Sequence, residues 1–431
     1  MVAYEHHLAF GEHTGLDLDI RGEIDQIRDN ANDFTQFEIG RYDADQFTNL
    51  AWRLLGRYIA PNTHLQRVVL DECGITDEIM ALLFEELVSS LSVERLDLDS
   101  NHFGIDGVRS MIPFLQNTPK FSILYLGLNS NINTECFELL ISALDGKSVK
   151  ELDFCDCNIT DISALETYSL PNLDSLSLTG NNIGREGITT LSIMLQKEDT
   201  RLTKLELKNT KIDDEDAEIL AASLKHNSKL KTLVSNNNNI TEKGLAAFLK
   251  LLNDISSIDN TYDSNHTLTN VKMFSLPPTN SKDNMLRLIN RACKYDDRRA
   301  KVISTQFNSE NRKELCQLQG IEYSPGSIFA DIEPIILPNI LTLIGERNGQ
   351  GELYTALVHT APDLMSFIDR KALIDGEMAK LAEQMSRLSQ QMSALSVKND
   401  QLSKRREMIE QGLSGQKQSM TDGDKKRKVQ Y

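Results

Sequence analysis

The sequence predicts an α/β solenoid with a parallel β-sheet on its inner face and helices outside, followed by a small α-helical module and a C-terminal coiled coil. An apolar pattern recurs from residue 65 at spacings of 28, 28, 28, 24, 29 and 28 residues. Helical stretches lie between the copies, and from residue 370 the apolar period changes to heptads. Because one such repeat cannot bury its apolar face alone, we expect the copies to stack.

The repeats share the pattern L-x-x-L-x-L-x-x-[NC]-x-[IL]. Each L-x-L is expected to be a short strand, since alternate residues of a strand face opposite sides. Residues 104–115 and 184–195 have the apolar spacing of amphipathic helices. The Asn or Cys of each copy is expected to bond backbone groups of neighbouring turns. The seven copies begin at Leu65, Val93, Phe121, Val149, Leu173, Leu202 and Leu230.

This period and pattern resemble a leucine-rich repeat protein of the ribonuclease-inhibitor-like type. The resemblance covers about half of the chain and implies a horseshoe that binds a protein on its concave face. The Ran GTPase activators carry the same type of repeat, so the resemblance leaves a regulator of a small GTPase as the alternative. No residue of this sequence can be given a catalytic role by that comparison.

Both ends of the repeat array are degenerate, as capping repeats are expected to be. Phe34, Phe37 and Ile39 keep the strand spacing and precede a predicted helix over 43–59, and Ile255 begins a degenerate final repeat. Pro277 and Pro278 then interrupt the pattern. The predicted organisation is an N-terminal segment over 1–33, a repeat domain with caps over 34–275, a helical module over 279–367, a coiled coil over 370–413 and a disordered basic tail over 414–431.

Charge is distributed unevenly along the chain, whose net charge is −17. Residues 62–270 hold 17 basic and 32 acidic residues, a net charge of −15. This segment should repel nucleic acid and attract basic surfaces. No apolar run long enough for a transmembrane helix and no signal peptide is expected. Six cysteines without framework spacing suit reduced thiols, so a nuclear or cytoplasmic location is expected.

The concave face is predicted to carry an acidic cluster over the first four repeats, because equivalent positions of successive repeats lie side by side. Two interpretations remain open. The cluster is either a solvated face that aids solubility, or a docking surface for a basic protein with Tyr125 as aromatic anchor. The acidic residues are Asp71, Glu72, Asp97, Asp99, Asp153 and Asp156.

Catalytic, cofactor and metal sites are not expected. The spacing of Asp97, Asp99 and Asn101 imitates the start of a calcium loop, but His102 stands where glycine is needed. Cys157 falls at the Asn/Cys position of its repeat, which explains the Cys155-x-Cys157 pair without a metal. His6, His7 and His13 could ligate a metal, yet an unstructured N-terminal tail is the preferred interpretation.

The heptad segment predicts a parallel homodimer. Leu at position d favours two strands, and Asn399 at position a would set the register. An antiparallel pair, or docking of the helix on the helical module, is the alternative, because Met at position a specifies weakly. The predicted seam contains Met378, Leu381, Met385, Leu388, Met392, Leu395, Asn399, Leu402 and Ile409.

The C-terminal tail carries a basic run that resembles a single-cluster nuclear localisation signal. The alternatives are a solvating tail and a tail that folds back on the acidic repeats. The run consists of Lys425, Lys426, Arg427 and Lys428.

Overall fold

The computed structural model describes residues 2–11, 16–273, 309–322 and the single residues 288, 289, 292, 294, 301, 302, 305 and 404. The chain divides into two compact units, 1–349 and 350–431. The predicted coiled-coil seam, the basic tail and His13 lie outside the described residues.

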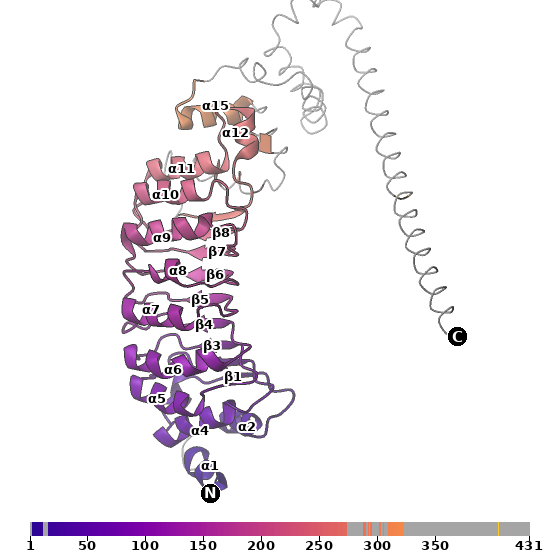
Figure 1. The fold of residues 1–431 in the computed structure, drawn as a ribbon, viewed down its shortest axis with the longest axis vertical. Coiled ribbons are helices and arrows are strands. Elements are labelled where there is room, and N and C mark those ends of the chain that lie inside the picture. Colours follow the sequence, from indigo (N-terminus) through magenta and orange to yellow (C-terminus); the bar gives the residue numbers. More distant parts are fainter. Residues whose placement is uncertain are drawn as a thin grey trace, which may run out of the picture. The chain divides into compact units, whose positions relative to one another are not determined.

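The predicted solenoid is confirmed. Within the described residues, nine parallel strands form one sheet in chain order, β1 to β9. Strands lie along one side of the stack and helices along the other (Figure 1). The strands are β1 Gln36–Glu38, β2 Arg67–Val69, β3 Arg95–Asp97, β4 Ile123–Tyr125, β5 Glu151–Asp153, β6 Ser175–Ser177, β7 Lys204–Glu206, β8 Thr232–Val234 and β9 Asn270–Lys272.

The helices follow the strands, as the apolar periodicity of the sequence requires. The fourth repeat is the shortest, with 24 residues, and its helix α8 has only four. Their bounds are α1 Val2–Phe10, α2 Leu18–Arg28, α3 Arg41–Ala44, α4 Asn49–Ile59, α5 Asp77–Glu86, α6 Ile105–Asn117, α7 Thr134–Ala143, α8 Ala164–Thr167, α9 Gly184–Gln196, α10 Asp214–Ser223, α11 Glu242–Leu252, α12 Ile258–Asp263 and α15 Ser309–Gln319.

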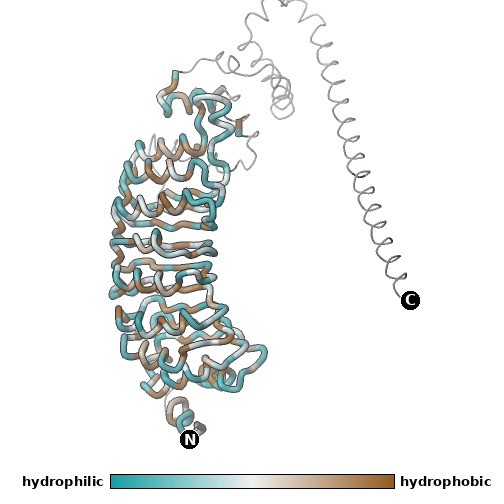
Figure 2. The backbone as a smooth tube through the Cα atoms, in the orientation of Figure 1, coloured by the Kyte–Doolittle hydropathy of each residue, from teal (hydrophilic) through white to brown (hydrophobic). Residues whose placement is uncertain are grey.

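The core lies between the sheet and the helices and is built from the consensus apolar positions. Leu124 and Leu126 on β4 and the following turn are fully buried, as is Phe137 on α7. Figure 2 shows apolar segments alternating with hydrophilic turns along the stack. Each repeat therefore buries its apolar face only against its neighbours, and stacking supplies most of its stability.

The asparagines at the Asn/Cys position of the repeats form the ladder of hydrogen bonds that the sequence predicts. The buried Asn129 side chain donates to the carbonyls of Leu98 and Leu126 at 2.9 Å, and its oxygen accepts from the Asn101 N–H at 3.1 Å. Asn181 bonds Phe154 and Leu178 in the same manner. The ladder thus satisfies buried backbone groups where each strand turns outward.

A carboxylate at the start of one helix caps the helix of the next repeat. Asp77 Oδ1 on α5 accepts from the N–H groups of Gly104 and Gly107 at 2.7 and 2.8 Å. A Cβ on Gly107 would lie 2.8 Å from this oxygen, so the close approach requires glycine. Asp214 bonds the N–H groups of Thr241 and Gly244 in the same way. These contacts hold successive helices in register.

The expectation of an unstructured N-terminus is wrong. Residues 2–10 form helix α1, and the His6 ring lies against Phe10 and Tyr58. Its Nδ1 is 3.1 Å from the Tyr58 hydroxyl, and burial lowers the pKa of His6. The predicted helix over 43–59 is also divided, since α3 ends at Ala44 and α4 begins at Asn49. The N-terminal segment therefore covers the apolar end of the first repeat.

The C-terminal end of the repeats is covered by residues from the predicted helical module. Lys301 is only 1% exposed, and its Nζ donates to the carbonyls of Leu252 and Asn265 at 2.8 and 2.7 Å. Gln319 on α15 donates to the Asn253 carbonyl at 2.7 Å. Strand β9, which the sequence did not predict, pairs with β8 beneath this cover. Such a cap shields the apolar edge of the last repeat.

Candidate protein-binding face

The sheet register brings the predicted acidic residues together on the concave face, the side of the sheet opposite the helices. Asp97 on β3 pairs with Tyr125 on β4, which pairs with Asp153 on β5. Asp71 and Asp99 follow β2 and β3 at equivalent positions. The carboxylates of Asp71, Asp97 and Asp153 all interact electrostatically with the carboxylate of Asp99, which makes a group of four. We call these four residues with Tyr125 the acidic cluster.

Crowding alters ionisation within the acidic cluster. Burial, and then the charges of Asp97 and Asp153, raise the pKa of Asp99 to about 7, although its Oδ1 accepts from the Gly127 N–H at 2.6 Å. Burial also raises the pKa of Asp71 and of Asp153. Because like charges at close range disfavour each other, a cation placed here would favour ionisation of Asp99.

Tyr125 is engaged within the protein. Its hydroxyl donates to Glu151 Oε2 at 2.7 Å, and the guanidinium carbon of Arg95 lies 4.2 Å from its ring centroid. Burial raises the pKa of Tyr125 to about 12. Arg95 also pairs with Asp97 at 3.1 Å, and Asp97 is only 7% exposed. One ring face and the hydroxyl of the predicted anchor therefore already have partners.

Three of the six predicted acids are accessible on this face, including Asp71 of the acidic cluster. Asp71, Glu72 and Asp156 are exposed. The Asp156 carboxylate lies over Gly180, where a Cβ would come within 2.0 Å of its Oδ1, and Gly180 has a φ of +77°. These three carboxylates, rather than Asp97, are the ones that a docking protein can reach.

The free energy of unfolding of Asp99→Asn, measured relative to that of the unchanged chain, should increase as the pH rises. The raised pKa of Asp99 means that the folded state holds the proton more tightly, so its stability falls as pH rises from about 4 to about 7. Asparagine has no such penalty. We expect the stability difference between variant and unchanged chain to grow by about 1–2 kcal/mol from about pH 5 to about pH 8, allowing for solvent screening.

Urea unfolding at the two pH values measures this difference, and the other carboxylates cancel in the comparison. Asparagine can still accept from the Gly127 N–H, so the turn is preserved. A difference that stays constant with pH would show that Asp99 ionises normally.

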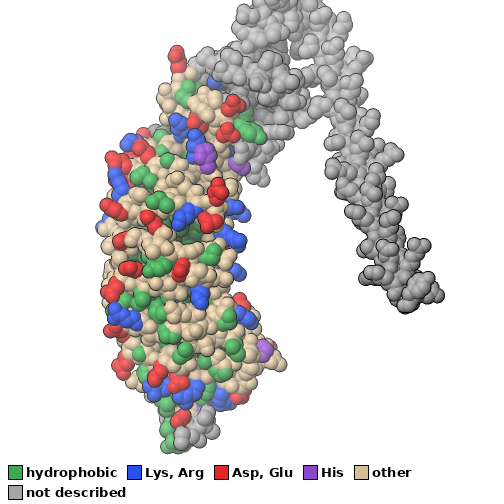
Figure 3. Space-filling view, in the orientation of Figure 1, with side chains coloured by type: hydrophobic (Ala, Val, Ile, Leu, Met, Phe, Trp, Pro, Cys, Tyr) green, Lys and Arg blue, Asp and Glu red, His purple; other side chains and the backbone are tan. Residues whose placement is uncertain are grey.

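Basic side chains occupy the other half of the concave face. Lys204 on β7 pairs with Glu206 at 2.8 Å, while Lys208 after β7 and Lys272 on β9 are exposed. Figure 3 shows Lys and Arg side chains along the strand edge in the upper half of the repeats. The concave face is therefore acidic over its first repeats and more basic over its last.

Among the residues that the structure describes, no group of three His, Cys, Asp or Glu side chains has a metal-binding arrangement. Cys157 lies in the ladder, and burial raises the pKa of its thiol to about 12. No helix within the described ranges is both long and apolar enough to span a bilayer.

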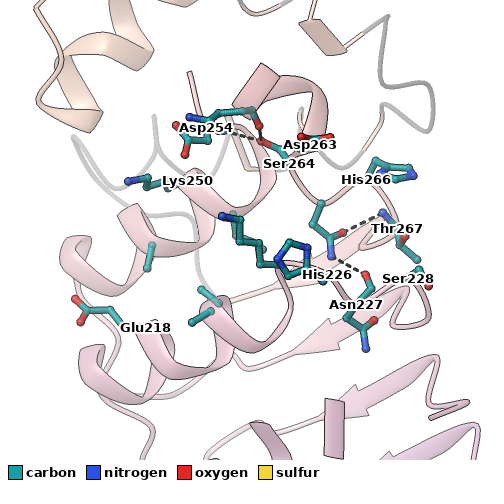
Figure 4. Close-up of a pocket in the computed structure, with 17 residues that line it drawn as sticks. Glu218, His226, Asn227, Ser228, Lys250, Asp254, Asp263, Ser264, His266 and Thr267 are labelled. Carbon is teal, nitrogen blue, oxygen red and sulfur yellow. Dashed lines mark hydrogen bonds between the residues drawn. The ribbon is translucent and has the colours of Figure 1, made fainter. Parts of the chain in front are cut away.

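A cleft of about 660 Å³ lies between α10, α11 and the segment that precedes β9. Figure 4 shows Ser264 and Asp254 joined by a hydrogen bond in its wall, with His226 and His266 nearby. Lys250 and Glu218 give it side chains of both signs. Because its charges are mixed, the cleft indicates no particular class of ligand.

Two family models match the repeats. The model "Leucine Rich repeats (2 copies)" matches residues 147–191, and "Leucine Rich repeat" matches residues 62–84. The chain is a leucine-rich repeat protein of the ribonuclease-inhibitor-like type. Its relatives support a protein-interaction role for these repeats.

Curated relatives match the repeat region. Mouse "NACHT, LRR and PYD domains-containing protein 5" is 27% identical over 217 residues, covering 42% of this chain and 18% of that protein. Human "Capping protein, Arp2/3 and myosin-I linker protein 3" is 26% identical over 221 residues, covering 51% and 14%. Pig "Ribonuclease inhibitor" is 30% identical over 177 residues, covering 41% and 34%. The matches thus span less than a fifth of the first two relatives and about a third of the last.

Among solved structures, the tropomodulin C-terminal domain of Caenorhabditis elegans aligns with a TM-score of 0.29 and 15% identity. The alignment covers 34% of this chain and 87% of that domain.

Sequence reasoning missed two residues of the concave face. Arg95 covers Tyr125 and pairs with Asp97. The signal for this contact was a basic residue at the third position of the repeat pattern, two residues before Asp97. Leu128 stands 55% exposed after β4. Its consensus position gave the only sequence signal, because leucine is unusual where neighbouring repeats have Ser100 and Asp156.

Proposed function

We propose that this leucine-rich repeat protein is a non-enzymatic scaffold that binds a basic protein segment on the acidic part of its concave face. The observation that carries this proposal is the sheet register, which places Asp97 and Asp153 on strands either side of β4 and near Asp99. After burial, the charges of Asp97 and Asp153 are the next causes that raise the pKa of Asp99. A lysine or arginine from a partner relieves that repulsion. Relatives with the same repeats support the general role of protein binding.

The exposed carboxylates at the edge of the cluster give the best test. Asp71→Asn with Glu72→Gln removes two accessible charges after β2 and leaves the buried Asp97–Arg95 pair intact. We expect about a fivefold weaker affinity for a fluorescein-labelled peptide of alternating lysine and arginine at low ionic strength, as for two exposed ion pairs. The difference should shrink as salt is added.

A matched control changes the same number of charges on the helical side. Glu138→Gln with Glu186→Gln alters two exposed acids on α7 and α9. Fluorescence anisotropy compares the three proteins, with an acidic peptide as negative probe. Equal weakening by both double variants would reduce the effect to net charge and contradict a site on the concave face.

We propose further that the chain self-associates through the predicted coiled coil over 370–413 and that the 425–428 run directs nuclear entry. Both of these proposals are based on the sequence pattern alone. The alternative role as regulator of a small GTPase has a match to the Dictyostelium discoideum "Rho GTPase-activating protein gacW", 27% identical over 213 residues, which covers 17% of that protein. A match over so small a part of that protein does not favour the GTPase role over the scaffold.

A further inference from the structure

Every repeat leaves its strand through one residue with left-handed backbone geometry, at the eighth position of the pattern. Glycine and asparagine tolerate this region, whereas a leucine side chain meets its own carbonyl there. The third repeat nevertheless has leucine, at Leu128. The eighth-position residues, with φ between 48° and 77°, are Glu72, Ser100, Leu128, Asp156, Gly180, Asn209 and Asn237.

The Leu128 side chain buries little apolar surface on folding, so burial does not offset the cost of its positive φ. Its φ is +58° and the residue is 55% exposed, so the side chain is not part of the core. The turn is held by the backbone, since the Leu128 N–H donates to the Cys155 carbonyl at 2.6 Å. A smaller or polar residue would satisfy the same turn, as Gly180 and Asn209 do in later repeats.

The position of Leu128 connects it with the acidic cluster. The backbone ladder places its turn between that of Ser100, whose N–H bonds the Gly127 carbonyl, and that of Asp156, whose N–H bonds the Thr179 carbonyl. Gly127, which precedes it, carries no side chain and bonds Asp99. Leu128 is thus an exposed apolar side chain with carboxylates on the neighbouring turns.

We propose that Leu128 is the apolar contact of the acidic face, and that the partner segment presents an apolar side chain flanked by lysine or arginine. This inference rests on the proposed function and specifies the partner. Tyr125 is less available for this apolar contact, because its hydroxyl already bonds Glu151 and Arg95 already covers one face of its ring. A leucine with positive φ and an exposed side chain lowers the stability of the free protein, and such strain is typical of residues that serve binding.

Stability provides the first arm of the test. Leu128→Asn should raise the midpoint of thermal unfolding by about 3 °C, because asparagine suits a positive φ. Ile193→Asn is the matched control. Ile193 is 43% exposed on the helix α9, where asparagine should lower the midpoint slightly. A lower midpoint for Leu128→Asn would contradict the argument from strain.

Binding provides the second arm, with two labelled peptides of alternating lysine and arginine that differ in one central residue, leucine or serine. We expect the unchanged protein to bind the leucine peptide about tenfold more tightly, as for burial of one leucine side chain. Leu128→Asn should abolish this preference, and Ile193→Asn should retain it. A preference that persists in Leu128→Asn would overturn the assignment.

The outcomes separate the two proposals. If both peptides bind equally well to the unchanged protein, the acidic face binds basic segments and only the role of Leu128 is lost. If neither peptide binds at low ionic strength, the proposed function fails, and the role of Leu128 fails with it.

Discussion

Replacing Asn129 with alanine should lower the free energy of unfolding by about 3 kcal/mol. Its buried amide donates to the carbonyls of Leu98, Leu126 and Gly127 and accepts from the Asn101 N–H. Alanine would leave these backbone groups in the interior without partners, and each such loss costs about 1–3 kcal/mol before relaxation. Urea unfolding followed by circular dichroism measures the loss.

Two further variants sharpen this measurement, one at the same position and one at an exposed asparagine elsewhere. Asn129→Asp has nearly the same shape but cannot donate to the carbonyls when ionised, so it should destabilise the protein at least as much. Asn182→Ala removes an exposed asparagine from a turn and should change the stability by less than about 0.5 kcal/mol. A loss below about 1 kcal/mol for Asn129→Ala would show that water replaces the ladder.

Replacing Lys301 with methionine should destabilise the C-terminal end of the repeats by about 3–5 kcal/mol. The buried ammonium group caps helix α11 by donating to the Leu252 carbonyl, and it also bonds the Asn265 carbonyl. Methionine would leave both buried carbonyls without this donor, and each unsatisfied buried group costs about 1–3 kcal/mol. Methionine keeps the length of the side chain, so packing is largely preserved.

Hydrogen exchange locates this effect. Amides of α11 and β9 should exchange faster in Lys301→Met, while those of β3 and β4 should change little, because each repeat contacts only its neighbours. Lys243→Met is the control, since Lys243 is exposed and solvent screens its 3.2 Å contact with Glu218. Unchanged exchange over residues 242–273 in Lys301→Met would contradict a capping role.

The repeat spacing was sufficient to predict the sheet and the neighbours on its concave face. Parallel strands of equal repeats pair at equal pattern positions, so Asp97, Tyr125 and Asp153 could be placed side by side from their numbers. The same logic predicted that Asn101 and Asn129 form a ladder. Helix α1 was not predictable in this way, because His6 contacts Tyr58, which is 52 residues distant and outside the repeat pattern.

The sequence by itself determined which residues line the core, which form the ladder and which acids share the concave face. These properties follow from a period of two along each strand and of about 28 along the chain. Only the tertiary structure decided which of those acids are accessible, that burial raises the pKa of Asp99 to about 7, and that Leu128 is exposed with a positive φ. Desolvation, charge crowding and backbone φ arise from the stacking of neighbouring repeats, and no single repeat contains that information.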